Sequence, residues 1–139
     1  ILVAIPSSHP ISKKFGKESQ KWPYPAISFA DLRGDDFIIM KPSRKMHGVY
    51  LNLCEQTKLK PKVVLESGSL ISAQALVASG LGVTLVTDTL ARYSRLAINP
   101  FYFMLKEKVE QRHLGLTYSK FVQPSKAALE FIELTKKTI

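Results

Sequence analysis

The sequence contains one cysteine, few acidic residues and no long apolar run. Because Cys54 is the only thiol, an internal disulfide framework is excluded. The longest apolar runs fall far short of the about 20 residues that a membrane-spanning helix needs, so we expect no membrane partner. The opening apolar run has no basic residue before it and is interrupted by Pro6, which argues against a signal peptide and predicts a cytoplasmic protein.

The remaining composition indicates one globular unit. In 139 residues, 45% are apolar, which is enough to build a core and argues against intrinsic disorder. The 20 Lys and Arg against 11 Asp and Glu give a net charge of +9. These basic residues are dispersed and do not alternate with aromatic residues, so we favour a solvated surface over a direct nucleic-acid interface. The chain starts in a strand-like run without an initiator Met, and we expect a fragment that lacks its N-terminal part.

Hydrophobic periodicity predicts an alternation of strands and helices. The predicted strands are residues 37–40, 63–65, 83–86 and 96–98. A helix follows each of the first three strands, with Ser43, the 67–69 segment and either Thr87 or Asp88 as N-caps. This alternation favours an α/β fold with a mainly parallel sheet flanked by helices.

The flanking segments are less regular. Before the alternating region lie the run 1–5, a Lys-rich loop and a short helix opened by Ser28. After it lie the apolar segment 101–105, a predicted strand at 113–118 and a last helix from Ser125.

The motifs that could carry catalysis or bind a cofactor do not have the required context. Gly80 and Gly82 follow a helix and precede a strand, whereas a dinucleotide-binding loop follows a strand and opens a helix. The three histidines lie in separate segments without metal-ligand spacing, and Cys54 falls on the apolar face of a helix. Residues 67–69 do not match a nucleophile elbow, and carboxylates do not pair at neighbouring strand ends. We therefore expect a protein that is not an enzyme and has no metal or cofactor.

A binding site without chemistry is the remaining possibility. Ligands of such sheets bind beyond the carboxyl ends of the strands, which here are residues 41–44, 66–69 and 87–89. Two of these segments open helices, whose free N–H groups favour anions. Ser43, Ser67 and Ser69 add hydroxyl groups and Arg44 adds positive charge. Helix capping explains the serines equally well.

The segment 63–86, VVLESGSLISAQALVASGLGVTLV, resembles the effector-binding domain of LysR-type transcriptional regulators. Its strand, polar break, helix, Ala-Ser-Gly-Leu-Gly turn and second strand occur in the order of that family. The resemblance extends over essentially the whole chain, through the segments 2–10, 28–39, 113–118 and the closing helix.

The resemblance implies a periplasmic-binding-protein-like fold (type 2), with one Rossmann-like lobe and part of a second lobe. Residues 28–110 would form a complete effector-binding lobe two. Residues 1–27 would be a crossover strand and loop, a remnant of lobe one. Residues 111–139 would be the return crossover strand and the C-terminal helix of lobe one. The DNA-binding helix-turn-helix would lie N-terminal to this chain, and the full protein would form a homodimer or homotetramer.

In function, the resemblance implies a domain that senses a small anionic metabolite and changes DNA binding. The effector-binding positions would be Ser43, Arg44, Ser67, Gly68 and Ser69. Thr87 stands where many members of the family have proline, so the cleft wall there would differ. The alternative function is that of a solute-binding protein of a transport system, which shares the architecture.

Overall fold

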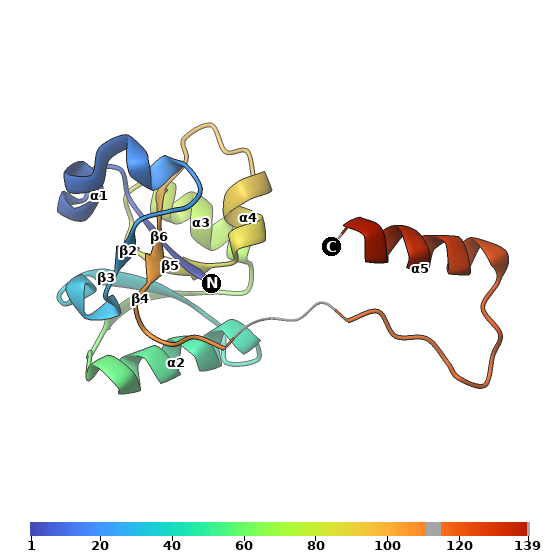
Figure 1. Ribbon diagram of the computed structural model, residues 1–139. Helices are drawn as coiled ribbons and strands as arrows, with labels where there is room; N and C mark the ends of the chain where they lie inside the picture. The colour runs from blue at the N-terminus through green and yellow to red at the C-terminus, as the bar shows by residue number, and fades with distance from the viewer. Residues whose placement is uncertain (111–114, 139) are drawn as a thin grey trace.

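The computed structural model describes residues 1–110 and 115–138 and has mixed α/β architecture (Figure 1). The strands are β1 (Leu2–Ile5), β2 (Ala26–Ile27), β3 (Asp36–Met40), β4 (Lys62–Ser67), β5 (Thr84–Val86) and β6 (Phe101–Leu105). The α-helices are α1 (Pro10–Phe15), α2 (Lys45–Thr57), α3 (Leu70–Ala78), α4 (Asp88–Tyr93) and α5 (Lys126–Thr138). Two 3₁₀ helices, η1 (Gly16–Gln20) and η2 (Phe29–Leu32), complete the described elements.

The strands form a four-stranded sheet, in the order β2-β6-β1-β5, and a parallel pair of β3 and β4. A parallel bridge between Phe37 and Val83 places β3 beside β5. The strand pairing is parallel except at β1, which runs antiparallel to both β5 and β6. The predicted α/β class is confirmed, with β1 as the strand that reverses direction.

Strand β1 is apolar at every position because both of its faces are buried. Its side chains alternate between two hydrophobic clusters, with Val3 and Ile5 in one and Leu2 and Ala4 in the other. Helix α2 and the two short helices around residues 10–15 and 29–32 cover the first face, while α3 and α4 cover the second. A sheet covered on both faces requires apolar side chains in both directions.

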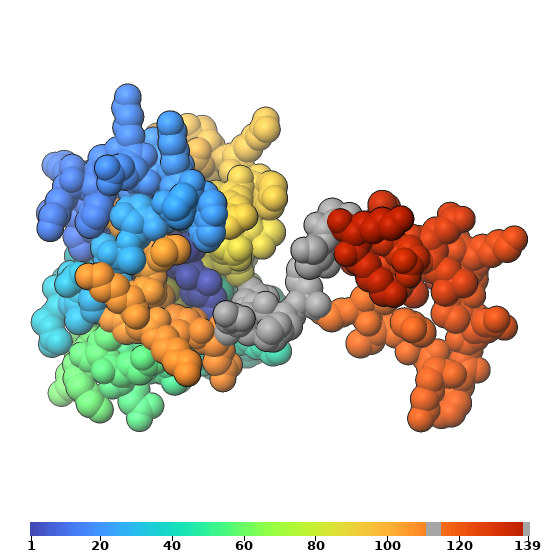
Figure 2. Space-filling view, in the orientation of Figure 1, coloured from blue at the N-terminus to red at the C-terminus, as the bar shows by residue number. Residues whose placement is uncertain are grey.

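Because β1 pairs on both sides with strands from residues 84–105, residues 1–27 pack in one body with residues 28–110. The predicted boundary between residues 27 and 28 therefore does not coincide with a gap in the packing. Helix α5 and the segment that precedes it stand apart from this body (Figures 1 and 2). Of the helices in the described residues, none is long and apolar enough to cross a bilayer.

The loop that joins α3 to β5 has the expected turn. Gly80 ends the helix with a φ of 92°, a conformation that favours glycine. At Gly82 the chain passes so close to β3 that a Cβ atom would collide with the carbonyl oxygen of Asp36. Both glycines therefore have a structural role, as their sequence context predicted.

Three predictions, one at the end of the alternating region and two in the flanks, differ from the structure. The strand at 96–98 is wrong: Ile98 is exposed, and the strand lies at Phe101–Leu105, where Tyr102 and Phe103 are buried. The Lys-rich loop contains α1, which begins with Pro10 after His9, whose ring Nδ1 accepts from the Ile11 N–H at 3.1 Å. Residues 115–118 form no strand, and the first two residues of that predicted strand lie outside the described residues.

Candidate functional site

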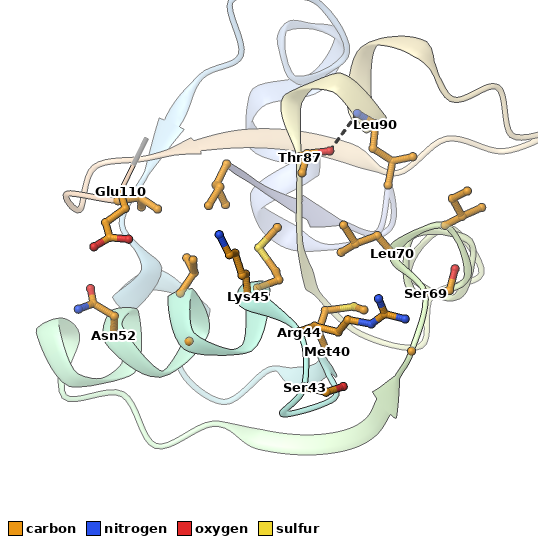
Figure 3. A pocket seen from close by; sticks show the side chains of 17 residues that line it. Met40, Ser43, Arg44, Lys45, Asn52, Ser69, Leu70, Thr87, Leu90 and Glu110 are labelled. Atoms are coloured by element: carbon orange, nitrogen blue, oxygen red, sulfur yellow. Dashed lines mark hydrogen bonds between the residues drawn. The ribbon is translucent and has the colours of Figure 1, made fainter. Parts of the chain in front are cut away.

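A cavity of about 1370 Å³ lies at the carboxyl ends of the central strands (Figure 3). Met40 at the end of β3, Gly68 after β4 and Thr87 after β5 line it. The first residue of the chain, Ile1, and Val109, which follows β6, also line it. Its volume exceeds the about 300–1,000 Å³ of an ordinary ligand pocket, as expected for an open cleft.

The loop before α2 leaves this helix without a side-chain cap. The Arg44 N–H donates to the Lys41 carbonyl at 2.9 Å, which closes a turn and makes Arg44 the N-cap. The predicted cap at Ser43 is therefore wrong, because this turn starts the helix one residue later. No side-chain hydrogen bond from the described residues caps α2. His47 contacts the Met40 carbonyl through Nδ1 at 2.8 Å and ties the start of α2 to the end of β3.

The loop before α3 is held by its own serines. The Ser67 hydroxyl donates to the Ser69 carbonyl at 2.9 Å and accepts from the Ser69 N–H at 3.2 Å. The Ser69 hydroxyl accepts from the Ser72 N–H at 3.3 Å and caps α3, as predicted. The capping explanation therefore holds for Ser69, whereas Ser67 stabilises the backbone of the loop without capping the helix.

The structure brings four of the five predicted site residues to one cavity. Ser43 and Arg44 line it from the loop before α2, and Gly68 and Ser69 line it from the loop before α3. Ser67 is 8% exposed and lies beneath this wall, where it contacts the Ser69 backbone rather than the cavity.

Further residues that were not predicted as site residues also line the cavity. One face of α2 lines the cavity through Lys45, Gly48, Val49 and Asn52. Their spacing of 3, 4 and 7 is that of a helix face, so this signal was present in the sequence. Glu110 follows β6, and only the tertiary structure brings it to the cavity.

The cavity is apolar in part and mainly positive in charge. Met40, Leu70, Leu90 and Val109 contribute its apolar surface. Thr87 also lines it, and the Thr87 hydroxyl accepts from the Leu90 N–H at 3.2 Å and caps α4. Among the described side chains that line the cavity, two are cationic and one is anionic: Arg44, Lys45 and Glu110. This arrangement suits an anion that has apolar parts.

Cys54 and His9, whose side chains could bind a metal or react, contact the core and helix α1 instead. Burial raises the pKa of the Cys54 thiol, which lies on α2 beside Tyr50 and packs against the core. The His9 ring caps α1, and its Nε2 lies 3.0 Å from an Asp35 carboxylate oxygen. Within residues 1–110 and 115–138, no group of three or more His, Cys, Asp or Glu residues could hold a metal ion.

Comparison with known proteins identifies the family. The model of the LysR substrate binding domain matches residues 19–139. The transcriptional dual regulator GltC of Bacillus subtilis (strain 168) is 26% identical over 137 residues, which cover 96% of this chain and 41% of GltC. The uncharacterized HTH-type transcriptional regulator YcgK of the same organism is 26% identical over 113 residues, which cover 76% of this chain and 35% of YcgK. The chain thus spans about two fifths of these relatives or less.

Solved structures show the same fold. HinK, a LysR family regulator from Pseudomonas aeruginosa, matches with a TM-score of 0.74 at 20% identity over 99% of this chain and 43% of HinK. The effector-binding domain of QuiR, solved with shikimate, matches with a TM-score of 0.68 at 17% identity over 99% of this chain and 59% of that domain. These matches confirm the predicted periplasmic-binding-protein-like fold and favour a regulator over a transport protein. The chain belongs to the LysR substrate binding domain family, whose members are the effector-sensing domains of transcriptional regulators.

Proposed function

We propose that this chain forms one wall of the effector site of a bacterial LysR-type regulator and that the effector is a small anionic metabolite. The observation that carries the proposal is the convergence of two loops on one cavity. Ser43 and Arg44 come from one loop and Gly68 and Ser69 from the other, and the loops are more than 20 residues apart in sequence.

Two features of the cavity favour an anion. Helices α2 and α3 both begin at the cavity, and the first N–H groups of a helix carry a partial positive charge. Arg44 adds a full charge with fixed, fork-shaped donors that match carboxylate and phosphate oxygens. Ser67 takes part indirectly, because it holds the Ser69 backbone in place.

Structural relatives support an acidic ligand. The QuiR domain was solved with shikimate and the BenM effector-binding domain with benzoate, and both ligands are carboxylates. The BenM domain matches this chain with a TM-score of 0.56 at 24% identity. The effector of this chain would share the acidic group of these ligands.

The wider organisation follows the family. Residues 28–110 would be the complete second lobe, residues 1–27 the crossover strand β1 and the connection that enters it, and residues 111–139 the return connection and the C-terminal helix of the first lobe. The exposed side chain of Phe131 in α5, 63% accessible, fits a helix that packs against first-lobe residues. The full protein would be a cytoplasmic homodimer or homotetramer that binds DNA through an N-terminal helix-turn-helix.

The mechanism would be a shift between two populations. An effector that contacts both lobes stabilises one closure of the cleft over the other, by an amount equal to its difference in affinity for the two forms. That closure would change how the oligomer presents its DNA-binding helices.

Calorimetry with the full-length protein tests the proposal. A panel of anionic, neutral and cationic metabolites of similar size should give binding to anions, and Arg44→Ala should weaken that binding. Binding of neutral or cationic metabolites alone, or anion binding unaffected by Arg44→Ala, would contradict the proposal.

A further inference from the structure

We propose that the cavity has two chemically different ends and selects an elongated effector, with an anionic group at one end and a hydrogen-bond donor, a hydroxyl or an ammonium, at the other. This inference rests on the proposed function and extends it to the class of ligand. Figure 3 shows Arg44 and Ser69 on one side of the cavity and Glu110 with Asn52 on the other.

The second end differs in charge from the first. An ionised carboxylate such as that of Glu110 can only accept hydrogen bonds, so a ligand group beside it must donate. A second carboxylate on the ligand would be repelled there, because like charges in a cleft disfavour each other. The side chains of Glu110 and Asn52 point toward one another in Figure 3, so one ligand group could contact both.

This end is braced by a side chain that lies outside the cavity lining. The Gln56 amide, one turn after Asn52 on α2, donates to the Asn52 side-chain oxygen. The same Gln56 nitrogen donates to the Lys108 carbonyl at 3.1 Å, two residues before Glu110. Gln56 thus joins the helix that carries Asn52 to the segment that carries Glu110. These hydrogen bonds orient the Asn52 side chain and fix the backbone two residues before Glu110 before a ligand arrives.

Gly48 opens the space between the two ends. It lies on the cavity face of α2 between Arg44 and Asn52, whose levels along the helix axis are about 12 Å apart at 1.5 Å per residue. A Cβ atom at Gly48 would meet nothing within 4 Å, so neither backbone conformation nor packing requires glycine there. Glycine within a helix is less stable than alanine. Its effect at this position is to leave a path over α2 along which an elongated ligand can lie.

The test uses four ligands that share one carboxylate and five methylene groups and differ only at the far end. These are ω-hydroxyhexanoate, ω-aminohexanoate, heptanoate and heptanedioate. We expect the full-length protein to bind the hydroxyl and ammonium ligands about tenfold more tightly than the methyl and dicarboxylate ligands, the size of one charge-assisted hydrogen bond.

A charge-neutral variant then identifies the residue responsible. Glu110→Gln should weaken binding of ω-aminohexanoate about tenfold and strengthen binding of heptanedioate. Glu55→Gln is the matched control, because it removes one negative charge from α2 at a residue outside the cavity lining, and it should leave the order of the four ligands unchanged.

The outcomes separate this inference from the proposed function. If heptanedioate binds as well as ω-hydroxyhexanoate, or if Glu110→Gln leaves the order unchanged while Arg44→Ala still weakens binding, the two-ended site is wrong and the anion site stands. If none of the four ligands binds and no anion of the wider metabolite panel binds, both proposals are overturned.

Discussion

Helices α2 and α3 begin at the same cavity, each directly after a parallel strand, but their first turns are built differently. Ser69 caps α3, and Ser67 holds the backbone of that loop. Helix α2 begins at Arg44 with no side-chain cap from the described residues. The loop before α3 is therefore mainly a structural element that also lines the cavity. In the loop before α2, the side chains of Ser43 and Arg44 line the cavity and, within the described residues, do not cap the helix.

The difference shows that a serine at a strand end has no fixed role. Ser43, Ser67 and Ser69 look alike in the sequence, and each follows a strand. In the structure, one lines the cavity before an uncapped helix, one lies beneath the loop and one caps a helix. Substitutions in the two loops should consequently separate effects on binding from effects on stability.

The largest expected effect is on binding, in the loop before α2. Arg44→Ala removes the charge and should weaken binding of an anionic effector by about 2 kcal/mol, or roughly thirtyfold. The free energy of unfolding should change by less than about 0.5 kcal/mol, because Arg44 is exposed and caps nothing with its side chain. Calorimetry and urea unfolding measure the two quantities. A large loss of stability without ligand would contradict the contrast between the loops.

The next effect is on stability, in the loop before α3. Ser69→Ala removes the cap of α3 and should lower the free energy of unfolding by about 1 kcal/mol, together with a smaller loss of effector affinity. Ser43→Ala is the matched control at the uncapped helix, and its unfolding midpoint in urea should equal that of the parent protein. Equal destabilisation by both substitutions would show that the two helices begin in the same way.

Ser67→Ala tests the indirect contribution. The substitution removes both hydrogen bonds between Ser67 and the Ser69 backbone, and we expect a loss of about 1 kcal/mol in stability. Effector affinity should fall only to the extent that Ser69 moves, so Ser67→Ala should weaken binding less than Arg44→Ala. A greater loss of affinity for Ser67→Ala, measured by calorimetry where both variants are folded, would assign Ser67 a direct contact.

The smallest effect is a pH dependence specific to α2. Burial raises the pKa values of Tyr50 and Cys54 on its inner face, so the folded protein holds these protons more tightly than the unfolded chain. The contribution of these two raised pKa values to the free energy of unfolding is present in full at neutral pH. It declines above about pH 8.5, where the cysteine of the unfolded chain begins to lose its proton. The double variant Tyr50→Phe and Cys54→Ala should show a shallower decline in the urea midpoint between neutral and alkaline pH. An unchanged slope would contradict this origin.

Local patterns predicted much of the central region. The strands at β3, β4 and β5 and the helices after them were predictable because each has a run of apolar residues with a clear turn signal at its end. The same holds for the caps at Ser69, Thr87 and Ser28, whose hydroxyls accept from backbone N–H groups two or three residues ahead.

Other features needed long-range information. The segments 96–98 and 101–105 are both apolar, and pairing with β1 selects the second as a strand. The antiparallel direction of β1 is equally invisible, since an apolar run has no direction. The acidic end of the cavity depends on Glu110 and Asn52, which are 58 residues apart and meet only after the chain folds.

Local sequence patterns were enough to predict the strands and helices of the central region, the turns between them and the family to which the chain belongs. These properties follow from neighbouring residues, because backbone preference and hydrophobic period act over a few positions. The tertiary structure alone decided which polar residues face the cavity and which support the fold. That outcome depends on where each loop lies against other elements, as Ser43 and Ser67 show.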